Sequence, residues 1–549
     1  MRMAVFLALC LDLSVAGPGF GEDSEQRLDR GLDRGVDRVF ASYAKSDSPG
    51  CAVGVIQDGN FVYRKGYGMG SLEQGVPLSP ESVFYMGSIA KQFTAASIVL
   101  AAEEGFLSLD DNIRKYIPEL PDYGQPITLR EMLHHTSGLA DFLGLIGISG
   151  RNLEDLHPTA ELMDLIVRQK ALNFHPGDEF LYSNTNYFLL AEVVKRATKM
   201  PLREFAAQNI FKPLGMAHTR FYDDHTVVVP GRVAGYSRGT GGAFLVDWST
   251  NYEIVGGGGL MSSVDDLLMW DRNFYHNMLG KTTFLKEMQA REALNDGTAN
   301  NYALGQFMST YRGLPIAEHS GANFGYRTNL LRFPQQNFTV VTLCNVSSAD
   351  PAGLSREVAD IYLEKELQPA PAGVAGSDPV LFAGKYFETR THYLVSFTAE
   401  RGNLVLEGHV LEPVERNRFA DPTSGATVTF SSADGVMKAS VTYNNALTFA
   451  GARIEALHVD GTALAAYAGV YKSAELDATY KLSLENGSLM LRAGWDPAIK
   501  LEPIVPNEFS VGGGLTLVFT GDNAGHISGL KVFSGWDGAI RNERFEKLN

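Results

Sequence analysis

The chain has few of the residues that would bind a metal ion or cross-link a small fold. Only three cysteines occur in 549 residues, which argues against a disulfide framework or a cysteine-based zinc site. The net charge is −16 and no long basic cluster offsets it, so nucleic acid and anionic membrane surfaces are disfavoured as partners. Beyond the first residues, no stretch approaches the roughly 18 unbroken apolar residues of a membrane span. We therefore expect a protein without a membrane span, whose partner is a small molecule or a short peptide.

The N-terminus is typical of a secretory signal peptide. Residues 1–17 combine an early arginine, an apolar run interrupted by Asp12, and small residues suited to cleavage. We assign residues 1–22 to this signal and expect a secreted or periplasmic protein. Cys51 and Cys344 lie in apolar, strand-like runs, which predicts buried free thiols; a bridge between them would require neighbouring strands.

The length predicts two to four domains. Residues 51–68 are typical of two strands joined at Asp58-Gly59, a strong hairpin signal. A second strand pair is predicted at 325–333 and 338–346, followed by an amphipathic helix at about 352–366. Between the two pairs lies a mostly helical stretch. The pattern predicts an α/β (α+β) domain over 23–367, with a sheet closed by the two ends of the domain and a helical subdomain beside it.

After a Pro/Ala/Gly-rich linker at 368–379 the sequence changes to short alternating strands that contain an internal repeat. The matching pairs are FAGKY (382–386) with YAGVY (467–471), LEPVERNRF (411–419) with LEPIVPNEF (501–509), and TVTF (427–430) with TLVF (516–519). Two homologous domains, 380–464 and 465–549, are therefore expected, each a small antiparallel β-barrel.

Ser88-Ile-Ala-Lys91 is the motif with the clearest chemistry. It lies between an apolar segment at 83–87 and a helical run at 92–105. Residues three apart on a helix share a face, so the Lys91 amine can reach the Ser88 hydroxyl and take its proton. The helix start also favours a developing oxyanion and a neutral lysine. By itself the pattern also fits an ordinary serine N-cap.

Two further motifs follow in order, namely Tyr182-Ser183-Asn184 and His319-Ser320-Gly321. The combination resembles the serine β-lactamase and penicillin-binding-protein superfamily, whose signatures are S-x-x-K, a Y-x-N or S-D-N element, and K-T-G. The Y-x-N form indicates the class C branch. Histidine replaces the usual lysine of K-T-G, as in the D-aminopeptidase and esterase relatives of that branch.

Three further segments resemble the catalytic domain of this family, so the resemblance covers about residues 30–366. They are LREMLHHTSGLADF (129–142), IFKPLGMAHTRF (210–221) and GGGGLMSSVDDLLMW (256–270). The resemblance implies a serine β-lactamase-like catalytic domain, and with two lipocalin-like barrels it implies the three-domain architecture of D-aminopeptidase.

The resemblance also assigns roles to the motif residues. Ser88 would be the nucleophile, Lys91 and Tyr182 would move protons, and Asn184 would orient substrate or the lysine. A neutral His319, with Gly321, would hydrogen-bond substrate instead of pairing with a carboxylate. The backbone N–H groups of Ser88 and Ala322 would form the oxyanion hole.

Other suggestive residues receive structural interpretations. Adjacent histidines such as His134-His135 rarely converge on one ion, so we expect a turn there and no metal site. The glycines at 256–259 lack a following Gly-Lys-Ser/Thr, which favours close backbone packing over a phosphate loop. We therefore expect no metal or organic cofactor.

The expected activity is hydrolysis through an acyl-enzyme, with small peptides or amides, particularly those with an N-terminal D-residue, as leading substrates. The alternatives are carboxylic esters, then β-lactams or D-Ala-D-Ala peptides, and finally a non-hydrolytic sensor or binding protein. A homodimer is compatible with the sequence.

The second repeat carries five extra residues within RAGWDPAIK (492–500). In the D-aminopeptidases that the chain resembles, a loop of the last barrel reaches the catalytic cleft. We therefore predict that Trp495 closes the pocket and that Asp496 holds a substrate ammonium, whereas the alternative is an exposed loop without a function.

Overall fold

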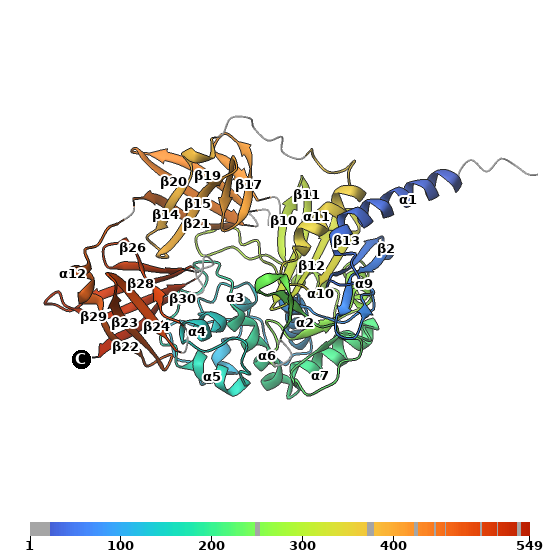
Figure 1. Ribbon diagram of the computed structural model, residues 1–549. Helices are drawn as coiled ribbons and strands as arrows, with labels where there is room; N and C mark the ends of the chain where they lie inside the picture. Colours follow the sequence, from blue (N-terminus) through green and yellow to red (C-terminus); the bar gives the residue numbers. More distant parts are fainter. Residues whose placement is uncertain are drawn as a thin grey trace, which may run out of the picture.

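The computed structural model describes residues 22–247, 253–369, 378–421, 426–443, 446–455, 457–494, 497–512, 514–534 and 540–548. Nearly all of the predicted signal segment and most of the predicted linker lie outside these residues, as do Trp495 and Asp496. A mixed α/β domain lies beside two β-barrels (Figure 1). The predicted fold class is therefore confirmed.

The α/β domain is built on a six-stranded antiparallel sheet in the order β10-β11-β12-β13-β1-β2. Its strands are β1 (Cys51–Gln57), β2 (Asn60–Tyr67), β10 (Phe307–Tyr311), β11 (Leu314–Asn323), β12 (Tyr326–Phe333) and β13 (Phe338–Cys344). The β1–β2 turn has positive φ at Asp58 and Gly59, as a tight hairpin turn requires. Because β1 pairs with β13, the two ends of the domain close the sheet as predicted.

Helices cover both faces of this sheet. On one face lie α1 (Glu22–Val39) and α11 (Pro351–Tyr362), and their apolar side chains share a core with Val53 and Val55 of β1. The alternate β1 residues Ala52 and Ile56 belong to the larger core on the opposite face. Strands buried on both sides read as continuous apolar runs, which explains the sequence CAVGVIQ.

The prediction of free thiols is wrong. Cys51 and Cys344 are directly opposite each other in the β1–β13 pair, and they form a disulfide that joins positions 293 residues apart. Each cysteine gave only a local apolar signal, and local patterns do not reveal which strands become neighbours.

The helical subdomain and the helices behind the sheet supply the second core. Their main helices are α2 (Ala90–Glu103), α3 (Leu129–Leu133), α4 (Phe142–Ile148), α5 (Thr159–Val167), α6 (Asn184–Thr198), α7 (Leu202–Ala206), α9 (Val264–Tyr275) and α10 (Phe284–Met288). Helix α2 is buried along most of its length. No helix in the described part of the chain is long and apolar enough to cross a membrane.

Two antiparallel barrels follow. The first is closed and contains β14 (Gly384–Glu388), β15 (Tyr393–Glu400), β16 (Asn403–Leu406), β17 (His409–Glu415), β18 (Arg418–Ala420), β19 (Thr427–Ala433), β20 (Val436–Tyr443) and β21 (Ala446–Ile454). The second is a nearly closed nine-stranded sheet of β22 (Gly469–Ser473), β23 (Ala478–Glu485), β24 (Ser488–Ala493), β25 (Ile499–Lys500), β26 (Glu502–Val505), β27 (Glu508–Gly512), β28 (Leu515–Gly521), β29 (Ile527–Ser534) and β30 (Ile540–Leu548).

Both barrels dock on the α/β domain, and they share one of its residues. Glu179 forms ion pairs with Arg390 of the first barrel and with Arg541 of the second. The second barrel also packs on α4, where the Tyr480 hydroxyl donates to the Ile148 carbonyl at 2.7 Å. Both barrels thus contact the segment that leads into Tyr182.

Candidate active site

Ser88 lies in a tight turn at the start of helix α2. The turn is the short helix η2 (Gly87–Ile89), and Gly87 has a φ of +55°. A Cβ atom at Gly87 would lie 2.6 Å from the Ala322 nitrogen, so only glycine allows this approach of η2 to β11. The Ser88 side chain remains partly exposed and is therefore accessible to a substrate.

Lys91 is fully buried and its amine contacts three oxygen atoms. Its Nζ donates to Ser88 Oγ at 3.1 Å, to Asn184 Oδ1 at 2.8 Å and to the Gly257 carbonyl at 2.7 Å. Burial lowers the pKa of Lys91 to about 7, although the Asp141 carboxylate acts in the opposite direction. A neutral amine keeps two N–H bonds for Asn184 and Gly257, and its lone pair is then left for the Ser88 hydroxyl.

Asn184 is held in place by Asp141, which caps helix α4. The Asp141 carboxylate accepts from the Asn184 backbone N–H and, at 2.8 Å, from the Asn184 side-chain amide. Because the amide nitrogen faces Asp141, the amide oxygen must face Lys91. Asp141 therefore orients a residue that contacts the proposed base.

Tyr182 lies against Lys91, with the lysine Nζ 4.6 Å from the ring centroid. Burial raises the pKa of Tyr182 well above its usual value, and the Ser88 side chain offsets part of this rise. The nearest polar partner of its buried hydroxyl is the Ser88 side chain, although among the described residues no contact reaches standard hydrogen-bond geometry. A protonated phenol beside the nucleophile can pass a proton without itself becoming ionised.

His319 is buried and has a defined tautomer. Its Nδ1 lies 2.6 Å from the Ser320 carbonyl, which can only accept, so Nδ1 carries the proton. Its Nε2 therefore accepts from the Tyr302 hydroxyl at 3.1 Å. Burial lowers the pKa of His319 to about 3, and Lys91 acts in the same direction. Both nitrogens have protein partners, so a substrate would have to replace Tyr302 to bond this ring.

Gly321 and Ala322 lie where β11 passes the Ser88 turn. A Cβ atom at Gly321 would lie 2.0 Å from the Met86 carbonyl, so this position requires glycine. The close approach brings the Ala322 nitrogen next to Gly87, beside the Ser88 backbone. This is the placement that an oxyanion hole made by Ser88 and Ala322 requires.

The sequence interpretation missed Asp141, Tyr302 and Phe307. Asp141 stands in a segment that carries the family resemblance, TSGLADF, so its position was a usable signal. Tyr302 contacts His319, and the Phe307 ring centroid lies 5.6 Å from that of His319. Neither aromatic residue belongs to a motif, and only the fold brings them to the site.

The predicted structural roles of the histidine pair and the glycine run agree with the structure. His134 Nδ1 contacts the Tyr302 carbonyl, and His135 Nδ1 accepts from the Ser183 backbone N–H. The Gly257 carbonyl accepts a hydrogen bond from Lys91 Nζ, and the Gly259 N–H donates to the Tyr85 hydroxyl. The histidine pair and the glycine run therefore position the backbone and the side chains around Lys91 and Tyr182.

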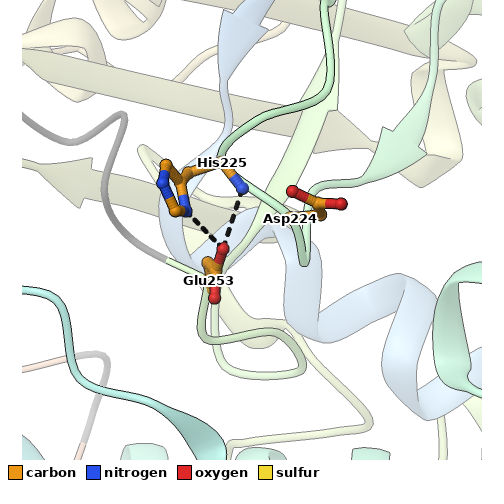
Figure 2. Close-up of side chains that lie close together, drawn as sticks. All are labelled: Asp224, His225 and Glu253. Atoms are coloured by element: carbon orange, nitrogen blue, oxygen red, sulfur yellow. Dashed lines mark hydrogen bonds and ion pairs between the residues drawn. The ribbon is translucent and has the colours of Figure 1, made fainter.

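In the described part of the chain, one group of three metal-ligating side chains lies close together: Asp224, His225 and Glu253 (Figure 2). His225 Nδ1 is 2.5 Å from the Glu253 carboxylate, which also accepts from the His225 backbone N–H. Asp224 accepts from the Thr226 backbone N–H and hydroxyl. The bonds between His225 and Glu253 join two segments, and those of Asp224 stabilise its own turn, so hydrogen bonding accounts for the cluster.

The fold and the arrangement of Ser88, Lys91 and Tyr182 are those of a serine hydrolase. The sequence model described as Beta-lactamase matches residues 36–363, more than half of the chain, so the chain belongs to this family.

Several curated proteins are similar to the chain. It is 27% identical over 449 residues to the D-aminopeptidase of Gluconobacter oxydans, which covers 80% of the chain and 82% of that protein. It is 24% identical to the D-aminopeptidase of Brucella melitensis biotype 2, covering 88% of the chain and 93% of that protein. Penicillin-binding protein 4* of Bacillus subtilis is 29% identical, covering 53% of the chain and 66% of that protein.

Solved structures support the fold. The octameric penicillin-binding protein homologue from Pyrococcus abyssi has a TM-score of 0.54 at 20% identity, covering 85% of this chain and 98% of that one. The D-amino acid amidase from Ochrobactrum anthropi SV3 has a TM-score of 0.52 at 20% identity, covering 61% of this chain and 99% of that one.

The site residues predicted on the extended loop cannot be placed, because Trp495 and Asp496 lie outside the described residues. The preceding residue, Gly494, packs on Gly150, which follows α4: a Cβ atom at Gly494 would lie 2.4 Å from the Gly150 carbonyl. The loop therefore starts at the helical subdomain, and its effect on the pocket stays a prediction.

Proposed function

We propose that this protein hydrolyses small amides or short peptides, particularly those with an N-terminal D-residue, through an acyl-enzyme on Ser88. The observation that carries the proposal is the position of the Lys91 amine, buried and 3.1 Å from Ser88 Oγ with its pKa lowered to about 7. The similarity to two D-aminopeptidases over 80% and 88% of the chain supports this substrate class.

The proposed reaction begins when neutral Lys91 takes the Ser88 proton. Ser88 Oγ attacks the substrate carbonyl, and the oxyanion is held by the backbone N–H groups of Ser88 and Ala322. The Lys91 proton then reaches the leaving amine through the Tyr182 hydroxyl, which gives up one proton and receives another. The amine departs, and water hydrolyses the ester of Ser88 to release the acid.

The first test is Ser88→Ala, measured with aminoacyl anilides of both configurations, carboxylic esters and a chromogenic cephalosporin. The variant should lose at least about a thousandfold of kcat and all labelling by a serine-directed phosphonate, while its circular dichroism stays unchanged. If it kept a tenth of the parent activity on every substrate, Ser88 would not be the nucleophile. Within the panel, a preference for esters or for the cephalosporin over the anilides would reject the proposed substrate class.

The second test is the pH dependence of kcat/KM. Since only neutral Lys91 can accept the proton, the rate should rise about tenfold per pH unit below pH ~7 and level off above it. A profile that is flat between pH 5 and pH 8 would contradict the role of Lys91.

We also propose that the protein works in a secreted or periplasmic, oxidising compartment. The predicted N-terminal signal and the Cys51–Cys344 disulfide support this. Cell fractionation with non-reducing mass spectrometry would test it, and a reduced protein found in the cytoplasm would contradict it. The homodimer stays a prediction for measurement by light scattering.

A further inference from the structure

The first barrel reaches the active site through one residue, Tyr443. Tyr443 is the last residue of β20, and its pairing with Ala446 closes the β20–β21 hairpin. Its ring packs edge-on against Phe307, with centroids 5.8 Å apart. The Tyr443 side chain is only partly buried. Figure 1 shows this barrel beside the edge of the sheet where β10 and β11 lie.

Phe307 connects this hairpin to the reacting groups. It is the first residue of β10 and lies opposite Glu318, one position before His319. The Phe307 ring is 5.6 Å from His319, and the His319 ring is 6.1 Å from Tyr182. A continuous row of rings therefore runs from Tyr182 to Tyr443.

Among the described strands, β11 has an unpaired edge that begins at His319, one of the rings in this row. β10 pairs with β11 only up to Glu318, and from His319 to Asn323 no described strand pairs with β11 on that side. An extended substrate can lie along such an edge. Phe307 lies at the beginning of this unpaired stretch, and Tyr443 packs against Phe307.

The direction of proton transfer decides which part of the substrate meets these rings. In the proposed reaction Tyr182 gives its proton to the leaving amine, so that amine lies beside Tyr182. A group attached to the amine is then within reach of the row of rings, which begins at Tyr182. Arg356 lies near Tyr443, but it is buried and its charge is paired with that of Glu318 at 2.6 Å, so the rings themselves favour an apolar group.

We propose that Tyr443, together with Phe307 and His319, forms a subsite for an aromatic or large apolar group on the leaving amine of the substrate. The proposal rests on the proposed function, and it makes the first barrel part of the substrate-binding surface. Aromatic side chains bury large areas and pair edge to face, which gives this subsite a preference for rings over small groups.

The experiment uses the full chain and substrates that share one acyl group, D-alanyl, and differ in the leaving amine: ammonia, propylamine or benzylamine. Tyr443→Ala should lower kcat/KM for the benzylamide by about 10-fold to 50-fold and change it by less than about threefold for the primary amide. Tyr443→Phe should stay within about threefold of the parent for all three. Hydrolysis of the preformed acyl-enzyme should not change, because the leaving amine has already departed.

Ser534→Ala provides the matched control. Ser534 closes the β29–β30 hairpin of the second barrel, at the position that corresponds to Tyr443, and pairs with Ile540. This variant should keep the parent preference among amines. If Tyr443→Ala lowered kcat/KM equally for all three substrates, Tyr443 would have only a structural role and the proposal would be overturned. Unchanged kcat/KM values for all three substrates would overturn it as well.

Failure of the proposed function can be recognised separately. If the parent cleaves none of the amides, two phosphonates with the same alkyl group are compared, one losing fluoride and one losing 4-nitrophenolate when Ser88 is labelled. Tyr443→Ala should slow labelling only by the aryl compound. Equal labelling rates in variant and parent for both compounds would overturn the subsite whatever the natural substrate is.

Discussion

The two barrels can be compared position by position, because the repeat that relates their sequences also relates their hydrogen bonds. The Tyr386 hydroxyl donates to the Phe382 carbonyl at 2.9 Å, and the Tyr471 hydroxyl donates to the Tyr467 carbonyl at 2.8 Å. In both barrels a bulge follows the proline of the LEP segment. The interior of the barrel is thus the part that the repeat preserves.

The contacts that the two barrels make with the α/β domain differ. The β20–β21 hairpin of the first barrel carries Tyr443 to Phe307, whereas the corresponding β29–β30 hairpin carries Ile540 to Gly144 of α4. The register also puts Tyr480, which contacts Ile148, where the first barrel has Val395. The same scaffold therefore serves two purposes: one copy borders the proposed substrate site, and the other supports the helix that Asp141 caps.

The largest loss of stability should come from removing the disulfide, and it should be confined to the catalytic domain because neither barrel contains a cysteine. Replacing Cys51 and Cys344 by serine should lower the free energy of unfolding of that domain by about 2–4 kcal/mol. Domain-resolved hydrogen exchange should show this loss in β1 and β13, with barrel protection unchanged. A similar loss of protection in the barrels would mean that the three domains unfold as one unit.

The next largest effect should come from the second barrel. The Arg541 side chain is only 8% exposed, and its two terminal nitrogens make three contacts of 3.1 Å to the Glu179 carboxylate. Arg541→Ala should cost about 2–3 kcal/mol, because it leaves the Glu179 carboxylate without its more buried partner. Thermal unfolding followed by calorimetry measures this cost. A change below about 0.5 kcal/mol would show that Arg390 alone is enough to hold Glu179.

Tyr480→Phe tests the contact of the second barrel with α4 by removing one oxygen. The lost hydrogen bond to Ile148 leaves a buried carbonyl unsatisfied, and we expect a cost of about 1 kcal/mol. Amide exchange in α4 should increase more than exchange elsewhere in the subdomain. As the control, Tyr471→Phe removes a bond inside the barrel and should leave α4 unchanged.

The smallest effect should come from Arg390→Ala in the first barrel. This side chain is 51% exposed, and exposed ion pairs contribute little, so we expect a loss below about 0.5 kcal/mol. Combining it with Arg541→Ala completes a double-mutant cycle on their shared partner, Glu179. A larger cost for Arg390→Ala than for Arg541→Ala would reverse the proposed ranking of the two barrels.

Much of the molecule could be predicted from the sequence, wherever the signal was local. The β1–β2 hairpin, the strands that close the sheet, α11 and the two-barrel repeat were predicted from periodicity, turn residues and self-similarity. The S-x-x-K spacing likewise places Lys91 next to Ser88, because three residues of helix fix that distance. The motif order indicated the family.

Only the tertiary structure decided the features that join distant segments. It paired Cys51 with Cys344 across 293 positions, set the Asp141 carboxylate on Asn184, and gave His319 its tautomer through Tyr302. It also assigned the contact with the active-site rings to Tyr443, a residue in no motif. Sequence periodicity reports which face of an element is buried, whereas the neighbours of that face depend on how the whole chain packs.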